Sequence, residues 1–115
     1  MPRTRSLKGG AELTESAPVF AALGDETRLR IVSRLSNDGP LSIARLSAGF
    51  PMTRQAITKH LRVMENAGLV RSAHHGRESV WQLDEKRLAE ARRHLQSISA
   101  QWDETLGRLK RLVEQ

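Results

Sequence analysis

Residues 84–115 carry apolar side chains at alternating spacings of three and four, the repeat of a helix that packs along one stripe. A helix that starts after Asp84, as its N-cap, and runs nearly to the end of the chain would be about 45 Å long at 1.5 Å per residue. A small domain cannot cover so long a stripe, so we expect a second copy of this helix to cover it. Residues 84–115 are therefore predicted to form a dimerisation helix. The repeat positions are Leu88, Ala91, Leu95, Ile98, Trp102, Leu109 and Leu112, with Thr105 at the one polar position and Leu106 and Val113 alongside.

Four shorter helices are predicted ahead of this one, each from a capping side chain followed by a periodic apolar run. The second ends where Asn37-Asp38-Gly39-Pro40 provides a stop and a turn. Ser16 is expected to cap a helix ending at Leu23, and Asp25 a helix over residues 26–36. Ser42 is expected to cap a helix of about two turns, and Thr53 the helix within residues 53–69.

The chain then changes to a period of two. Residues 70–74 and 78–83 predict two strands around His75-Gly76, with Trp81 and Leu83 on the face that packs on the core. Two helices joined by a short turn, the second polar on its outer face, describe a helix-turn-helix, and the hairpin is expected beside the second helix. We therefore predict a mainly α fold with a small β-hairpin, in the order helix-helix-helix-helix-strand-strand-helix. This domain is expected over residues 15–83, with dimerisation through the last helix.

The segment 53–69 predicts a helix with two opposed faces. At about 100° per residue, an apolar side forms around Ile57, with Ala56, His60, Val63 and Ala67 along one flank, and we expect these side chains to pack inward. A DNA major groove suits the opposite side, because amides and hydroxyls match base edges and cations neutralise phosphates. An ordinary solvated face is the alternative. The outward set is Gln55, Thr58, Lys59, Arg62 and Asn66.

Positive charge gathers on the same segment. The chain holds 19 Lys and Arg against 13 Asp and Glu, a formal charge of +6. Residues 53–77 contain five cations and one acid, which makes +4 for this stretch alone, and residues 1–10 add three cations and no acid. A basic balance of this kind favours a polyanionic partner or an acidic membrane surface.

Composition also excludes several classes. There is no cysteine, so disulfides, thiolate metal sites and thiol switches are absent. No apolar run approaches the roughly 20 residues that span a bilayer, and there is no signal peptide core, so we expect no membrane partner and a soluble, cytoplasmic protein. The polar, glycine-containing start predicts a disordered basic tail over residues 1–14. No phosphate-binding loop, serine elbow or zinc-protease motif is present, and we expect no enzyme activity.

Three segments together resemble the ArsR/SmtB family of bacterial winged helix-turn-helix repressors. Residues 20–32 (FAALGDETRLRIV) are similar to the family's entry into its second helix, although the usual proline is here Glu26. Residues 53–70 resemble its recognition helix, and Gly76-Arg77 followed by residues 80–83 (VWQL) resembles its wing. The likeness covers most of residues 19–84.

The resemblance implies a symmetric homodimer, held by the first and last helices, that binds an imperfect palindrome with one recognition helix per major groove. It also implies repression, usually of the gene's own operon. The family's metal sites do not transfer: its cysteine pair falls at Leu41-Ser42-Ile43-Ala44, and the last helix has His94 alone, with Asp103 and Glu104 nine and ten residues later. We expect no metal and no cofactor, as in family members without such sites, and the effector is unknown.

Five side chains of the recognition helix are candidate contacts to double-stranded DNA. Gln55 and Thr58 are the base-reading candidates, because a glutamine amide can hold adenine with two hydrogen bonds and threonine offers a hydroxyl and a methyl. Arg54, Lys59 and Arg62 are expected to hold phosphates, with a guanine as the alternative for Arg54.

Other candidate contacts lie at helix starts and on the hairpin. Thr53 caps its helix and could also meet a phosphate, and Ser42 has the same two roles with the structural one favoured. Arg77 and His75, near the hairpin tip, are expected to reach the minor groove or its phosphates, rather than a metal.

The expected partner besides DNA is a second copy of the chain. A protein-binding winged helix without sequence-specific DNA readout is the alternative function, and the cations on the outward face and the wing speak against it. Trp102 could line an effector pocket instead of packing between subunits. The candidate dimer residues are Val19, Phe20, Leu88, Ala91, Leu95, Ile98, Trp102, Leu106 and Leu109.

Overall fold

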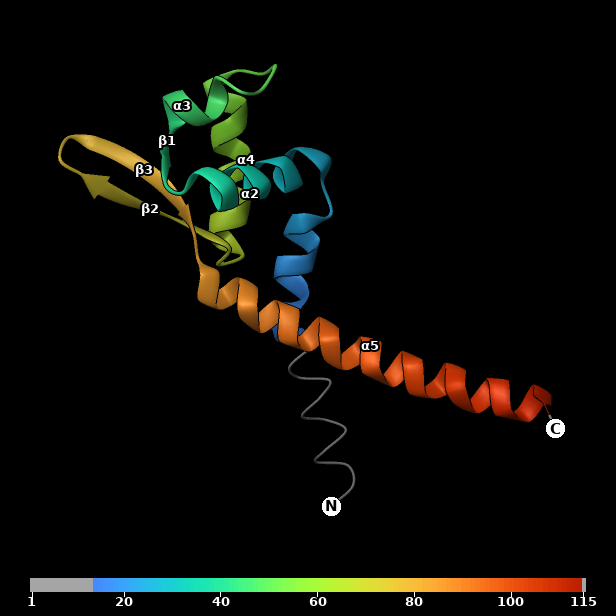
Figure 1. Ribbon diagram of the computed structural model, residues 1–115. Helices are drawn as coiled ribbons and strands as arrows, with labels where there is room; N and C mark the ends of the chain where they lie inside the picture. The colour runs from blue at the N-terminus through green and yellow to red at the C-terminus, as the bar shows by residue number, and fades with distance from the viewer. Residues whose placement is uncertain (1–13, 115) are drawn as a thin grey trace.

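The computed structural model describes residues 14–114. Helical residues 14–23 come first, so the predicted tail over residues 1–14 lies almost wholly outside the described range. Figure 1 shows the shorter helices gathered into one small domain, with the hairpin projecting from it and the last helix continuing well past it. This arrangement confirms the predicted mainly α fold with a hairpin. The remaining elements are α2 (Glu26–Asp38), β1 (Leu41–Ser42), α3 (Ile43–Ser47), α4 (Arg54–Asn66), β2 (Val70–His75), β3 (Glu78–Leu83) and α5 (Glu85–Glu114).

Three of the four expected caps of the shorter helices are confirmed. In each, a side-chain oxygen accepts a hydrogen bond from a backbone N–H that the first turn leaves without a partner. The cap of α2 is Asp25, which accepts from Arg28 N at 3.0 Å. The caps of α3 and α4 are Ser42 and Thr53, which accept from Arg45 N at 3.2 Å and Ala56 N at 3.0 Å.

The prediction that Ser16 caps the first helix is wrong. Thr14 and Glu15 are already helical, so Ser16 lies inside the first helix. It is buried, and its hydroxyl contacts Nδ1 of His94 on α5. The predicted end of α2 is also two residues short, since the helix reaches Asp38 and stops at Gly39, whose φ of 76° lies in the left-handed region that favours glycine.

The hairpin is confirmed, and it belongs to a three-stranded sheet in the order β1-β3-β2. Strands β2 and β3 are antiparallel, from Val70 opposite Leu83 to His75 opposite Glu78. Strand β1, which the sequence analysis did not predict, adds Leu41 opposite Trp81. It has two residues, too few to show an alternation, and only its pairing with β3 defines it.

The core lies between the helices and the sheet. Trp81 belongs to it and Leu83 packs against it, which confirms the face predicted for β3. Among the described residues, no helix is both long and apolar enough to cross a membrane. The buried core side chains are Val19, Ala22, Ile31, Leu35, Leu41, Leu46, Ile57, Leu61, Met64, Leu69, Val70, Trp81 and Ala91.

Asp25 makes the stability of the fold vary with pH in the acid range. Its pKa lies below the ordinary value, chiefly because Arg28 N–H donates a hydrogen bond to its carboxylate. The ionised form is favoured in the folded chain, so its stabilisation is present above the ordinary pKa and is lost as pH falls through the lowered pKa. Asp25→Asn keeps a capping oxygen but removes the titration.

We therefore expect Asp25→Asn to be less stable than the wild type at neutral pH, and this difference to shrink as the solution becomes strongly acidic. Urea unfolding of both proteins across the acid range measures it. A difference that stays constant with pH would contradict the assignment.

Candidate nucleic-acid interface

Helix α4 buries one side and exposes the other. Ile57, Leu61 and Met64 are fully buried, as the helical period predicts. Val63, which was expected to pack inward, is 44% exposed because it lies about 120° from Ile57 around the helix. We call the opposite, solvent-facing side the outward face of α4. It comprises Gln55, Lys59, Arg62 and Asn66, all exposed, with the half-buried Thr58 at its edge, and we add to it the exposed Arg54 of the first turn, which lies about 60° from Ile57 around the helix.

Several groups on the outward face are free to meet a ligand. In the described part of the chain, Arg54 and Lys59 form no ion pair, and both reach solvent. The hydroxyl of Thr58 donates to the carbonyl oxygen of Arg54 at 2.8 Å, which leaves its oxygen lone pairs and its methyl available. Thr53 is exposed at the start of the helix, although its hydroxyl already accepts from Ala56 N.

Arg62 differs from the other cations of this face because its guanidinium has two partners. Its Nη1 lies 2.9 Å from Oε1 of Glu65. Its Cζ lies 5.4 Å from the centroid of the Trp81 ring on β3. The expected phosphate contact through Arg62 would therefore compete with contacts inside the chain.

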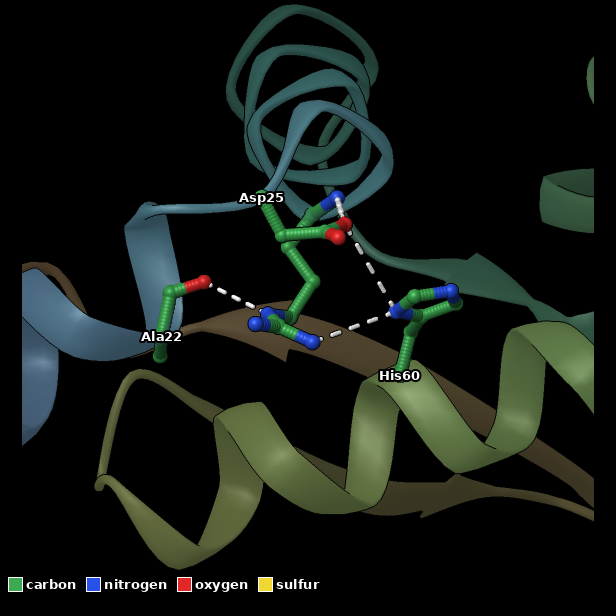
Figure 2. A network of polar contacts seen from close by, with 4 residues as sticks. Ala22, Asp25 and His60 are labelled. Atoms are coloured by element: carbon green, nitrogen blue, oxygen red, sulfur yellow. Dashed lines mark hydrogen bonds and ion pairs between the residues drawn. The ribbon is translucent and has the colours of Figure 1, made fainter.

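The inner side of α4 is held by a polar network that Figure 2 shows. Arg28 Nε donates to the carbonyl oxygen of Ala22 at 2.6 Å, and its Nη1 lies 3.4 Å from Nδ1 of His60. Asp25 Oδ2 lies 3.8 Å from the same nitrogen. The network therefore joins α4 to the start of α2 and to the end of the first helix.

The hairpin places its candidate residues at an exposed tip. Gly76 has a φ of 65°, which a tight two-residue turn requires and which other residues rarely adopt. His75 and Arg77 flank it and are exposed, and Figure 1 shows the tip projecting from the domain. Over residues 14–114, no three His, Asp or Glu side chains gather in a way that could hold a metal ion.

Ser42 does not lie on this surface. It is 5% exposed, it pairs with Val80 in the sheet, and its hydroxyl accepts from Arg45 N. A buried and occupied hydroxyl cannot reach a phosphate, so we withdraw Ser42 from the candidate DNA contacts and keep its capping role.

Helix α5 leaves a row of apolar side chains uncovered along its length. We call this row the α5 stripe, and Figure 1 shows that most of α5 extends beyond the domain. Val19 is 0% exposed and belongs to the core of a single chain, so we remove it from the candidate dimer contacts, whereas Ala91, 3% exposed, packs in the core and also lines the groove described next. The α5 stripe consists of Leu95, Ile98, Trp102, Leu106 and Leu109, of which all but the half-buried Ile98 are more than half exposed.

A shallow groove of about 510 Å³ continues the α5 stripe onto the domain. Phe20 and Leu88, the two other candidate dimer residues, are half-buried in its wall, and Leu95 belongs to both the groove and the stripe. The groove and the α5 stripe thus meet at Leu95.

Comparisons with known proteins agree with this geometry. A family model described as a helix-turn-helix domain matches residues 23–73. HTH-type transcriptional regulator Rv2034 of Mycobacterium tuberculosis is 37% identical over 95 residues, which cover 83% of this chain and 85% of the relative. An ArsR-like transcriptional regulator from Rhodococcus sp. RHA1 is 39% identical, with a TM-score of 0.75 over 86% of this chain and 92% of that one.

A further solved structure is the homodimeric winged helix-turn-helix DNA-binding domain Mb0332 from Mycobacterium bovis, a possible ArsR-family transcriptional regulator. It is 23% identical, with a TM-score of 0.62 over 84% of this chain and 86% of its own, and shows the shared fold.

The fold and the outward face of α4 define a DNA-binding transcriptional regulator of the winged helix-turn-helix class, a class without catalytic activity. The chain belongs to the ArsR/SmtB family of these regulators.

Proposed function

We propose that the protein is a homodimeric repressor that binds a palindromic operator, with α4 of each subunit in a major groove. The observation that carries this proposal is the outward face of α4. It presents two amides and Lys59 to solvent opposite a fully buried apolar side, with Arg54 exposed in the first turn, and neither cation has an ion pair within residues 14–114. A helix held this firmly can enter a groove as a rigid element.

The side chains of the outward face divide into two roles. Gln55 and Thr58 read bases, since the amide offers a donor and an acceptor and the threonine keeps an acceptor and a methyl. Arg54 and Lys59 hold phosphates, and Thr53 lies at the helix start, where backbone N–H groups favour an anion. His75 and Arg77 extend the contact from the hairpin tip to the minor groove or its phosphates.

The α5 stripe and the adjoining groove support the dimer. Leu95, Trp102, Leu106 and Leu109 would be costly to leave in water, and a second copy offers the same surface in return. The homodimeric state of the Mb0332 domain, which has the same fold, agrees with this arrangement. A dimer fixes the separation of two α4 helices at about one DNA turn, roughly 34 Å.

Repression then follows from occupancy, because a dimer on a promoter obstructs polymerase. We propose that the protein acts in the bacterial cytoplasm, on the operon that encodes it. Its control by expression level alone is compatible with the composition of the chain, which has no cysteine.

Two substitutions on the outward face test the proposal. Gln55→Ala is expected to reduce the binding free-energy preference for one base pair in each half-site by about 1–3 kcal/mol, because a contact with two hydrogen bonds is lost. Lys59→Ala is expected to weaken binding to all DNA sequences alike and to reduce the magnitude of the slope of log affinity against log salt concentration by about 0.9. The operator is first selected from random-sequence DNA with the wild-type protein, and affinities are then measured at several salt concentrations.

Arg93→Ala is the matched control for Lys59→Ala, since it removes an exposed cation from α5, away from the outward face. It should leave the affinity and the slope nearly unchanged. Equal effects of the Gln55 and Lys59 variants would refute the division of roles. Failure of the wild type to enrich any sequence would refute the operator and favour a protein-binding scaffold.

A further inference from the structure

One contact joins the recognition helix to the central strand of the wing. Arg62 on α4 places its Cζ 5.4 Å from the centroid of the Trp81 ring on β3. This distance is within the roughly 6 Å over which a guanidinium is attracted to an aromatic face, and tryptophan is the strongest of the aromatic partners. Trp81 is 6% exposed and belongs to the core, so it offers a fixed platform.

A second contact holds the same guanidinium from its own helix. Glu65, one turn further along α4, accepts from Nη1 of Arg62 at 2.9 Å, and its side chain is 32% exposed. The charge of Arg62 is therefore balanced locally, whereas Arg54 and Lys59 have no acid partner in the described part of the chain. The Arg62 side chain is still 61% exposed, so its partners, rather than burial, distinguish it from these two cations.

The position of Trp81 explains what this contact controls. Strand β3 pairs with β1 through Trp81 and Leu41, and with β2 through Trp81 and Ser72. The strand begins at Glu78, directly after the turn that carries Arg77, so Trp81 lies three residues from the start of the wing strand. The contact between Arg62 and Trp81 thus joins α4 to the strand that leads from the wing tip.

From these contacts we propose that Arg62 is a positioning residue that orients the wing against the recognition helix, and that it does not bind a phosphate. The proposal rests on the proposed function, in which α4 and the wing contact one duplex at the same time. Loss of Arg62 leaves each contact group in place but lets the two elements diverge. The loss of affinity therefore falls on specific binding to the operator, because there α4 and the wing must both be correctly placed on the same duplex.

The test compares Arg62→Ala and Arg62→Lys with the wild type, using the selected operator and an unrelated duplex over a range of salt. Both variants are expected to lose about threefold to tenfold in operator affinity, because neither restores a stacked guanidinium. Binding to the unrelated duplex and the salt slope should stay unchanged. Circular dichroism confirms that the variants are folded.

A double-mutant cycle provides a second readout that a general loss of stability would not produce. If Arg62 orients the wing, Arg77→Ala should cost less in the Arg62→Ala background than in the wild type, whereas Arg54→Ala should cost the same in both.

A salt slope that falls by about 0.9 in Arg62→Ala and returns in Arg62→Lys would overturn the proposal and make Arg62 a phosphate contact. Full additivity with Arg77→Ala would also overturn it. Absence of operator binding by the wild type is a different failure, because it refutes the proposed function itself.

Discussion

Replacing Leu95 and Trp102 with glutamate is expected to convert the proposed dimer into monomers and to lower operator affinity by roughly a hundredfold or more. These side chains are 55% and 60% exposed in the single chain, so charges there leave the core intact. Between two subunits the same carboxylates would lose water without gaining a partner, which is strongly unfavourable. Each monomer would then bind one half-site alone, without the gain in affinity that comes from linking the two subunits. Light scattering measures the mass, and mobility shift measures the affinity.

The matched control is Ser97→Glu with Ala100→Glu. It adds the same two charges to exposed positions on the opposite side of α5, so any general repulsion from DNA appears in both proteins. The control should remain dimeric and keep most of its affinity. Tight specific binding by a proven Leu95/Trp102 monomer would refute the dimer geometry.

Leu61→Ala is expected to lower the free energy of unfolding by about 2–5 kcal/mol. Leu61 is fully buried in the middle of α4, where its side chain belongs to the core. Truncation removes apolar contacts and leaves a cavity, against a total stability of only about 5–15 kcal/mol for domains of this kind. Urea unfolding measures the change, and operator binding should fall in step with the folded fraction.

Val63→Ala provides the comparison on the same helix. Val63 is 44% exposed, so its truncation should cost less than about 1 kcal/mol. Similar losses in the two variants would mean that the buried side of α4 has been misassigned.

Local rules account for the elements that the sequence predicted correctly. The caps Asp25, Ser42 and Thr53 each bond a backbone N–H three residues ahead, so their effect is contained within one turn. The burial of Ile57 and Leu61 follows from the helical period in the same way. The hairpin was also predictable, since its alternation and its turn residues lie within fourteen consecutive positions, 70–83.

The candidate site was predictable only in part. The outward face of α4 and the hairpin tip were both anticipated, but the availability of each side chain was not. Ser42 turned out to be buried beside Val80, and Arg62 to be held by Trp81, because both outcomes depend on how β3 packs against other elements.

The sequence by itself determined the helices, three of the four caps of the shorter helices, the hairpin and most of the side of α4 that faces water, because these depend on neighbours within a few positions. Only the tertiary structure decided which apolar side chains remain uncovered and which polar groups are already occupied. Ser16 contacts His94 across 78 positions, Arg28 reaches His60 across 32, and Val19 and Ala91 are buried in one chain. Such contacts depend on the packing of whole elements, which no local period encodes.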